Sequence, residues 1–386
     1  MSSRLRVPSL LLFFSLSSFV AVTACGSSSG EPGPTGAAPA AEDPAIVRAY
    51  VTVAKAGYGE ALAKTRDLQT AVDAFVADPT AEKLEAAKAA WLAARGPYGR
   101  TEVYRYFGSP IDDEVKGPEG RVNGWPLDEA YIDYVVDQPN AGIINHPSEY
   151  ASITKELLAE LNEKDGEANL STGYHAIEFL LWGQDLSETG PGARPFGDYV
   201  SAPNAERRRT YLKTVTDLLV EDLSGVAAGW NDADPSSYAA GFLKLPQKEA
   251  LTKAFRGIVM LTGIEIARER MDNAYKKGEQ EEEHSCFSDN TTADLSANIR
   301  GVENVYVTSR LHELVRAKDP ALDDRVKDKL GAAIAAIEAI PAPFDRAIVD
   351  LDKRPKIGAA IDATKALTDA LIEAAKALDV HVDIVE

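Results

Sequence analysis

The sequence predicts an all-α protein built from bundled helices. Apolar residues recur three and four positions apart over long stretches, which is the spacing of one helix face. Short breaks rich in Gly, Pro and Asp separate these stretches, and the alternating pattern of β-strands is essentially absent. Long helices joined by short connections are typical of helical bundles.

The breaks and capping residues set the expected helix ends. Asp78-Pro79-Thr80 ends the first periodic stretch and places Thr80 as the N-cap of the next one, and residues 288–290 offer further N-cap side chains. The expected helices cover residues 44–77, 80–107, 126–136, 148–161, 173–185, 204–230, 235–243, 247–277, 291–307, 320–340, 343–351 and 356–378.

Residues 1–24 are expected to be a lipoprotein signal peptide. Arg4 and Arg6 give it a positive start, and the apolar run that follows is too short to cross a membrane comfortably. It ends in Val-Thr-Ala-Cys, which resembles the lipobox of bacterial lipoproteins and implies lipidation of Cys25. Residues 25–43, rich in Ser, Gly, Pro and Ala, are expected to form a flexible tether.

The lipobox implies a location in the bacterial cell envelope. The lipid anchor would be the only attachment to a membrane, because no later stretch is long and apolar enough to span one. The residue after Cys25 is Gly rather than Asp, which favours the outer membrane, with the protein facing the periplasm. The alternative is a soluble secreted protein that is cleaved nearby.

The composition argues against a nucleic-acid-binding function and against stabilisation by an intramolecular disulfide bond. The formal net charge is -19 and the pI is near 4.8, which argues against a nucleic-acid-binding protein. The chain has two cysteines, Cys25 and Cys286, so lipidation of the first leaves no intramolecular disulfide. Stability must therefore come from packing.

The segment 173–185 carries the clearest chemical pattern. As a helix, it places His175, Glu178, Trp182 and Asp185 on one face, where a core helix would carry Leu or Val. An imidazole and a carboxylate three residues apart can converge on one metal ion, as the Glu-x-x-His pairs of carboxylate-bridged bundles do in the reverse order. The alternative is a helical pair that only shares a hydrogen bond.

A second polar stripe is predicted on the helix of residues 80–107. It contains side chains at steps of four, three, four and three, namely Trp91, Arg95, Tyr98, Glu102 and Arg105. Charged groups there would be costly in a dry interior unless they satisfy one another. The stripe is interpreted either as a buried ion-pair network between helices or as a wall facing a ligand, and the two interpretations are compatible.

The helix of residues 247–277 adds two carboxylates. Glu265 and Glu269 lie four residues apart, and either could complete a metal site that contains His175 and Glu178. Alternatively, they pair with Arg268 or Arg270 on a solvated face.

Four segments together resemble the imelysin family of exported bacterial proteins. They are 91–105, 117–129 with its Asn-x-Trp-Pro-x-Asp-Glu run, 173–185 with its Gly-x-His-x-x-Glu motif, and 263–291. The string His-Ser-Cys-Phe-Ser-Asp-Asn-Thr at 284–291 is similar to a hallmark of the iron-regulated protein A branch. The resemblance implies two packed helical bundles with the site between them, here assigned to residues 44–203 and 204–386.

The resemblance and the spacing together give an expected site. The expected metal ligands are His175, Glu178, Asp185, Glu265, Glu269 and His284. The expected lining is Arg95, Tyr98, Glu102, Arg105, Asn123, Trp125, Asp128, Gly173, Trp182, Ser285 and Asp289. Such a donor set suits iron or manganese at least as well as zinc, and the expected cofactor is a divalent metal, with iron first and zinc second.

The leading functional hypothesis is an envelope-anchored protein that binds a metal ion or a small metal complex for iron acquisition, together with envelope iron-uptake partners. The family name suggests a metallopeptidase instead. The residue four positions beyond His175 is Phe179, however, so the His-Glu-x-x-His arrangement of common zinc peptidases is missing. The third hypothesis is a non-catalytic, partner-binding envelope lipoprotein whose polar stripes only join helices.

Overall fold

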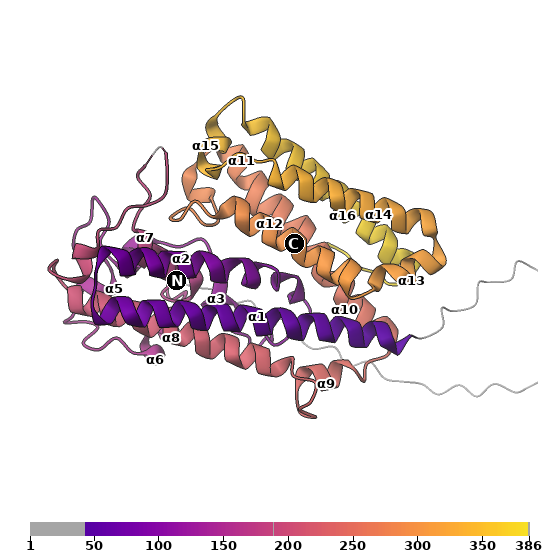
Figure 1. Cartoon of the computed structure of the whole chain (residues 1–386), viewed down its shortest axis with the longest axis horizontal. Helices are drawn as coiled ribbons and strands as arrows, with labels where there is room; N and C mark the ends of the chain where they lie inside the picture. Colours follow the sequence, from indigo (N-terminus) through magenta and orange to yellow (C-terminus); the bar gives the residue numbers. More distant parts are fainter. Residues whose placement is uncertain (1–42, 188, 385–386) are drawn as a thin grey trace, which may run out of the picture. The chain divides into compact units, whose positions relative to one another are not determined.

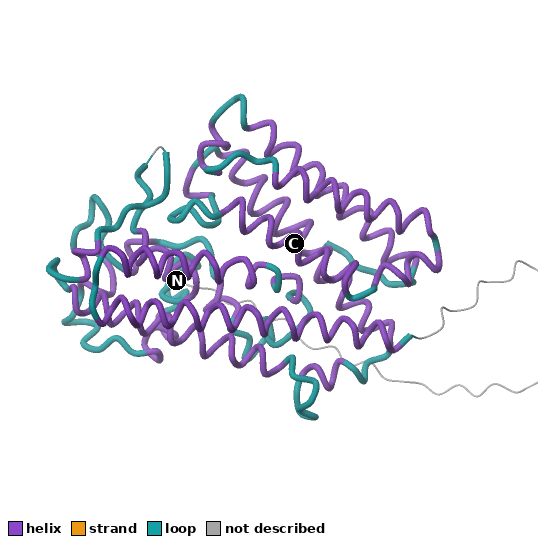
Figure 2. The backbone as a smooth tube through the Cα atoms, in the orientation of Figure 1, coloured by secondary structure: helices purple, strands orange, loops and turns teal. Residues whose placement is uncertain are grey.

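The computed structural model describes residues 43–187 and 189–384. The predicted signal peptide, the lipidated Cys25 and nearly all of the predicted tether therefore lie outside the described residues. Within these ranges the chain forms helices and loops, and the one ladder contact is an isolated bridge between Val135 and Gln138 (Figure 2). The all-α prediction is confirmed.

The first bundle is formed by four helices. Helices α1 and α8 run beside each other, α2 packs on α1, and α7 fits between α2 and α8 (Figure 1). The helices up to this point are α1 (Pro44–Ala77), α2 (Ala81–Gly99), η1 (Glu102–Tyr104), α3 (Glu119–Asn123), α4 (Glu129–Ile132), α5 (Gly142–Asn145), α6 (Lys155–Leu161), α7 (Gly173–Trp182), η2 (Phe196–Tyr199) and α8 (Ala205–Gly229).

The second bundle packs α16 against α14 and against the π-helical segment η3, with α12 beside α14. Its elements are α10 (Gln247–Met260), η3 (Leu261–Asp272), α11 (Asn273–Lys277), η4 (Gln280–Glu282), α12 (Thr291–Glu303), η5 (Asn304–Thr308), α13 (Leu311–Lys318), α14 (Pro320–Glu338), α15 (Phe344–Val349) and α16 (Arg354–Ala377). The short helix α9 (Tyr238–Phe242) packs instead against Tyr50 of α1 and Trp230 at the end of α8. The expected two packed helical bundles are therefore present.

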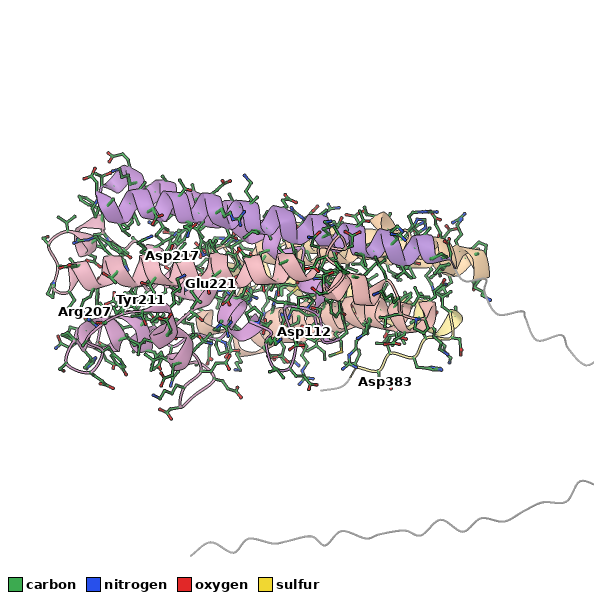
Figure 3. The ribbon with its side chains drawn as sticks, turned by 90° about the horizontal axis from the view of Figure 1, so that it is seen from below. Asp112, Arg207, Tyr211, Asp217, Glu221 and Asp383 are labelled. Atoms are coloured by element: carbon green, nitrogen blue, oxygen red, sulfur yellow. The ribbon has the colours of Figure 1, made fainter. Side chains whose placement is uncertain are left out.

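Helix α8 lies between α1 and α6 (Figure 3). On one side its Asp217 accepts a hydrogen bond of 2.7 Å from Gln69 of α1, and on the other its Glu221 pairs with Lys155 of α6 at 2.6 Å. The predicted domain boundary between residues 203 and 204 stays a prediction. Among the described helices, none is both long enough and apolar enough to cross a membrane.

Two expected helix ends were wrong, for local reasons. The helix predicted over 80–107 ends at Gly99, whose carbonyl accepts a hydrogen bond of 3.0 Å from Asn298 of α12. This cross-bundle cap satisfies an open carbonyl and lets the chain turn into η1. The helix predicted over 173–185 ends at Trp182, because Gly183 follows with a φ of 72°.

Three shorter elements also differ from the expectations. The helices predicted over 126–136 and 148–161 shrink to α4 and α6, because Asp128 and Thr154 cap them at later positions. Helix α3 lies in a segment that was expected to be a loop.

The bundles meet where α12 contacts α2 and where α10 contacts η1. Gly257 of α10 is buried there, and a Cβ atom at this position would overlap the carbonyl oxygen of Val103. The absence of a side chain allows this close approach of the two backbones.

Replacing Gly257 with Ala should therefore lower the free energy of unfolding by about 1–3 kcal/mol, because the new methyl group forces η1 away from α10. The matched control is Gly59→Ala in α1, where a Cβ would meet nothing within 4 Å. That change should be neutral or stabilise the helix by up to about 1 kcal/mol. Urea unfolding followed by circular dichroism measures both, and equal stability of the two variants would contradict the prediction.

Candidate functional site

The helix that carries the His-x-x-Glu pair is buried along its whole length. Every residue of α7, from Gly173 to Trp182, is inaccessible or nearly so. It is surrounded by α2, α3 and α8. Polar side chains on this helix must therefore find partners inside the protein.

His175 is held by one ring nitrogen and left open at the other. Its side chain is 1% exposed, and Nδ1 lies 2.9 Å from Oε2 of Glu178. The second nitrogen, Nε2, is buried and has no hydrogen-bond partner among the described residues. Burial, together with the positive charge of Arg95, lowers the pKa of His175 to about 3. The imidazole is therefore neutral at pH 7.

Glu178 uses both carboxylate oxygens. Oε2 faces His175, while Oε1 accepts hydrogen bonds from Ser288, at 3.0 Å from the backbone nitrogen and 2.6 Å from Oγ. Burial raises the pKa of Glu178 to about 8, although the Ser288 hydroxyl and Arg95 work in the opposite direction. The carboxyl group thus links α7 to the segment that precedes α12.

A second neutral imidazole lies beside the first. The rings of His175 and His284 are 4.7 Å apart between centroids, with an interplanar angle of 75°. His284 is also buried, and burial together with Arg270 lowers its pKa to about 3. Its Nδ1 lies 3.4 Å from Oδ2 of Asp294 without forming a proper hydrogen bond, and Trp125 packs edge-on against its ring.

Around the imidazoles lies a buried network centred on Arg95. Its guanidinium binds the two oxygens of Asp294, at 3.3 and 2.9 Å, and Oδ1 of Asn123 at 2.5 Å. The rings of Tyr98 and Tyr174 lie within 6 Å of the guanidinium carbon. Ser285 donates to the same Asp294 at 2.5 Å, so the segment around His284 is bound to this network.

A second group of buried charges continues the network. Glu102 pairs with Arg270 at 2.5 Å and accepts a hydrogen bond from Asn298 at 3.0 Å. Asn123 links Glu102 to Arg95 through contacts of 3.4 and 2.5 Å. These side chains come from α2, η1, α3, η3 and α12, so both bundles contribute. The ion-pair interpretation of the stripe on residues 91–105 agrees with this arrangement.

A pocket of about 330 Å³ opens beside the network. Its wall contains one of the two imidazoles, two arginines and several carboxylates. The lining residues are Arg105, Glu119, Gly120, Asn123, Gly124, Trp125, Glu163, Glu167, Leu170, Glu265, Glu269, Arg270 and His284. Six of them were predicted as ligands or lining: Arg105, Asn123, Trp125, Glu265, Glu269 and His284.

The two carboxylates of η3 have arginine partners as well as access to this pocket. Glu265 lies 3.2 Å from Arg270, and Glu269 lies 3.2 Å from Arg268. Both side chains also line the pocket. Because η3 is π-helical, its residues advance by smaller angles than those of the regular helix that was expected. The arginine partners named in the alternative are present, but the pairs are five residues and one residue apart rather than three or four, and Arg270 is buried rather than on a solvated face.

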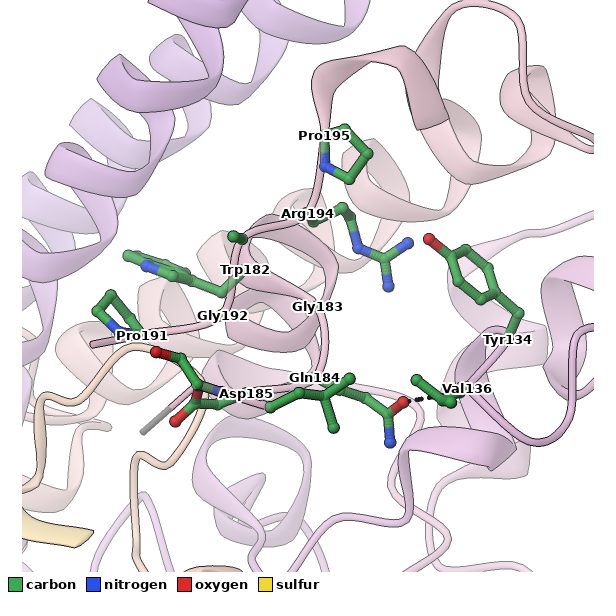
Figure 4. Close-up of a pocket in the computed structure, with 13 residues that line it drawn as sticks. Tyr134, Val136, Trp182, Gly183, Gln184, Asp185, Pro191, Gly192, Arg194 and Pro195 are labelled. Atoms are coloured by element: carbon green, nitrogen blue, oxygen red, sulfur yellow. Dashed lines mark hydrogen bonds between the residues drawn. The ribbon is translucent and has the colours of Figure 1, made fainter. Parts of the chain in front are cut away.

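Three predicted residues lie outside this pocket. Trp182 and Asp185 line a different pocket of about 400 Å³, in which Arg194 lies over the ring of Tyr134 at 5.2 Å (Figure 4). Asp185 also lines a third pocket of about 130 Å³, together with His284 and Trp125. Asp185 follows the end of α7 and binds Gln280 rather than sharing a helix face with His175. Asp128 is exposed and caps α4 by accepting from the Ala130 nitrogen at 3.0 Å.

Several important residues were not predicted. Ser288 and Asp294 fix the two site residues Glu178 and Arg95, and Glu283 lies next to the predicted Asp289. Ser288 and Asp294 follow His284 closely, but short polar residues near a helix start are usually caps. The packing of α12 against α2 decides which buried groups Ser288 and Asp294 bind, and local sequence does not show this packing.

The model of the imelysin (peptidase M75) family matches residues 54–371. Iron-regulated protein A of Synechococcus elongatus is 24% identical over 345 residues, covering 85% of this chain and 82% of that protein.

Two solved structures share the fold. One is described as an iron-regulated protein A precursor from Parabacteroides distasonis (TM-score 0.69, 21% identity, covering 89% of this chain and 97% of that chain). The other is an imelysin-like protein from Psychrobacter arcticum (TM-score 0.66, 12% identity, covering 90% and 99%). At these identities the likeness shows the fold alone.

The buried charges predict a specific acid sensitivity. Burial opposes ionisation of Glu102, but Arg270 and Arg105 lower its pKa to about 2 from an ordinary value of 4.5. The stability that this pair contributes is therefore fully present above pH 4.5 and is lost as the pH falls towards 2.

Glu102→Gln should lower the free energy of unfolding by about 1.5–3 kcal/mol at pH 7, because Arg270 then keeps only Glu265, at 3.2 Å, as a counter-charge. The difference from the unmodified protein should shrink between pH 4.5 and 2. Urea unfolding over this range measures it, and a constant difference would contradict the assignment.

Proposed function

Because this chain belongs to the imelysin family, we propose that it is a binding protein that holds one metal ion, or a small metal complex, at His175 and His284. The observation that carries the proposal is the buried Nε2 atom of His175, which has no hydrogen-bond partner among the described residues. A neutral imidazole nitrogen in this state is a ready metal ligand, and a second neutral imidazole lies 4.7 Å away between ring centroids.

The hydrogen-bond partners around His175 are those expected of a histidine that binds a metal ion. Metal-binding histidines usually donate their other ring N–H to a carboxylate, which fixes the ring and its tautomer. Glu178 is placed for this role, 2.9 Å from Nδ1, and Ser288 donates two hydrogen bonds to its other oxygen. We therefore propose His175 as a ligand and Glu178 as the residue that orients it, with His284 as the second ligand.

The pocket of about 330 Å³ supports access of a cation to the two imidazoles. His284 lines it, and carboxylates on the same wall offer oxygen ligands to an ion or to a hydrated complex. Arg105 and Arg270 on the same wall could bind anionic groups of a metal complex. Two imidazoles with nearby carboxylate oxygen atoms suit iron first and zinc second. The metal is cargo in this proposal, rather than a cofactor for a reaction.

Two further observations support a role in iron acquisition at the envelope. A protein 24% identical to this chain carries the name iron-regulated protein A. The Val-Thr-Ala-Cys sequence ending at Cys25 supports a lipid anchor, for which we propose the outer membrane and a periplasm-facing protein. Partners would then be envelope components of iron uptake.

A metallopeptidase is the second candidate, favoured by one observation. Glu178 is a buried carboxyl group whose pKa burial raises to about 8, and such groups are found among catalytic acids and bases. Both of its oxygens are already bound to His175 and Ser288, however. This leaves the binding function as the better supported proposal.

Replacing His175 with Ala should abolish binding of iron(II) and zinc(II), because it removes the open nitrogen. The unmodified protein should bind about one equivalent of metal, measured by calorimetric titration under anaerobic conditions and by elemental analysis. His146→Ala is the matched control, since His146 is exposed and its ring contacts only the Gly142 carbonyl in the described structure. Unchanged metal content in a folded His175→Ala protein would overturn the proposal and favour a purely structural role.

Glu178→Gln separates an orienting role from a ligand role. An amide keeps the shape of the side chain but cannot ionise when a metal binds, so metal affinity should fall roughly 10–100-fold without disappearing. Complete loss of binding, as in His175→Ala, would instead show that Glu178 is itself a ligand.

The same proteins incubated with an unfolded protein substrate and metal should show no cleavage. Metal-dependent cleavage lost in Glu178→Gln would establish the peptidase.

A further inference from the structure

Three carboxylates outside the imidazole site converge inside the second bundle. Glu283 follows η4, Asp289 precedes α12, and Asp345 is the second residue of α15. Each offers an oxygen atom, and these three atoms lie within 4.8 Å of one another. Two separate parts of the chain, the segment 283–289 and α15, thus bring negative charges to one point.

Glu283 is buried in this cluster without favourable partners. Its side chain is fully buried, and neither carboxylate oxygen has a hydrogen-bond partner of normal geometry among the described residues, although the Thr291 side chain opposes the rise in the pKa of Glu283. Oδ1 of Asp289 is also buried and unpartnered. An unpaired buried carboxylate is strongly destabilising, and two neighbouring carboxylates increase that cost.

The positive charge beside the cluster does not reach all three residues. Arg346 lies next to Asp345, with Nε 3.1 Å from Oδ2, and its backbone nitrogen donates to Oδ1 at 2.6 Å. In the described structure Arg346 forms no ion pair or hydrogen bond with Glu283 or Asp289, although its charge opposes the rise in the pKa of Asp289. The nearby Asp185 and Glu178 add further negative charge around Asp289. The cluster is thus short of positive charge where Glu283 is buried.

We propose that Glu283, Asp289 and Asp345 bind a hard divalent cation. An ion bonded to oxygen atoms at about 2.3–2.6 Å can touch ligands that are up to roughly 4.6–5.2 Å apart, which matches the spacing of this cluster. Ligands that are all carboxylates favour calcium, manganese or magnesium over metals that prefer imidazole. Calcium fits best, because its coordination tolerates irregular geometry and its bonds have this length.

The ion would join the segment 283–289 to α15. That segment also contains His284, and it contains Ser288, which donates to Glu178. The cation would therefore stabilise the part of the chain that positions the imidazole site, while binding to a separate set of atoms. The proposal stands independently of metal binding at His175.

The test is calorimetric titration of the full chain with Ca²⁺, Mn²⁺ and Mg²⁺, together with its melting temperature. One equivalent of cation should bind and raise the melting temperature. Glu283→Gln and Asp345→Asn should each weaken binding by at least about tenfold. The matched control is Asp369→Asn, which removes an exposed carboxylate from α16.

The metal-free variants provide a second measurement. With no cation bound, burial and the neighbouring carboxylates raise the pKa of Glu283 well above its ordinary value, which favours the neutral acid. Glu283→Gln should therefore leave the metal-free protein about as stable as the unmodified chain, so loss of binding cannot be ascribed to unfolding. Asp289→Asn, at a half-buried position, replaces Glu283→Gln in this test if that variant does not fold.

His175→Ala should retain this site, and Glu283→Gln should retain zinc binding, so the two proposals fail separately. No binding of any of the three cations, or unchanged affinity in Glu283→Gln, would overturn the inference.

Discussion

The buried pairing of Arg95 with Asp294 is the interaction on which the rest of the site depends. A guanidinium on α2 and a carboxylate on α12 cannot be left alone in a dry interior, so the two bundles must meet where these groups meet. Burial works against ionisation of Asp294, yet Arg95 holds the pKa of that carboxyl well below its usual range. Ser285 binds the same carboxylate, which brings His284 next to His175.

The same charges explain the state of the imidazoles. Burial is the largest cause that opposes protonation of His175 and His284. Arg95 and Arg270 add to it at His175, and Arg270 adds to it at His284. Both rings therefore remain neutral, which is the form that binds metal. The network thus has two effects, since it joins the bundles and also keeps the imidazoles uncharged. A positively charged network is unfavourable for a cation, and the carboxylates Asp294 and Glu102 offset it.

The long helices could be predicted from the sequence, whereas the contacts between them could not. Helix α1 spans residues 44–77 as expected, because its apolar spacing and its Pro at the first position are local signals. The end of α2 depends on Asn298, nearly two hundred residues later in the chain. The two histidines of the site were both recognised, as was Arg95. Asp294 was missed, because which buried partner it binds is decided only by packing.

The cluster of Glu283, Asp289 and Asp345 is another case in which the sequence does not reveal a contact that the fold creates. Asp289 was predicted as a lining residue, but Glu283 belongs to a run of acidic residues that looks solvated, and Asp345 lies in an ordinary amphipathic segment. Nothing in the local sequence shows that these groups become buried together.

The most direct test of the central claim is anomalous diffraction from crystals grown with iron(II) or zinc(II), with data collected at the absorption edge of the metal. The account predicts an anomalous peak within bonding distance of the Nε2 atom of His175. A peak confined to the acidic cluster, or no peak near either imidazole in fully loaded crystals, would contradict it.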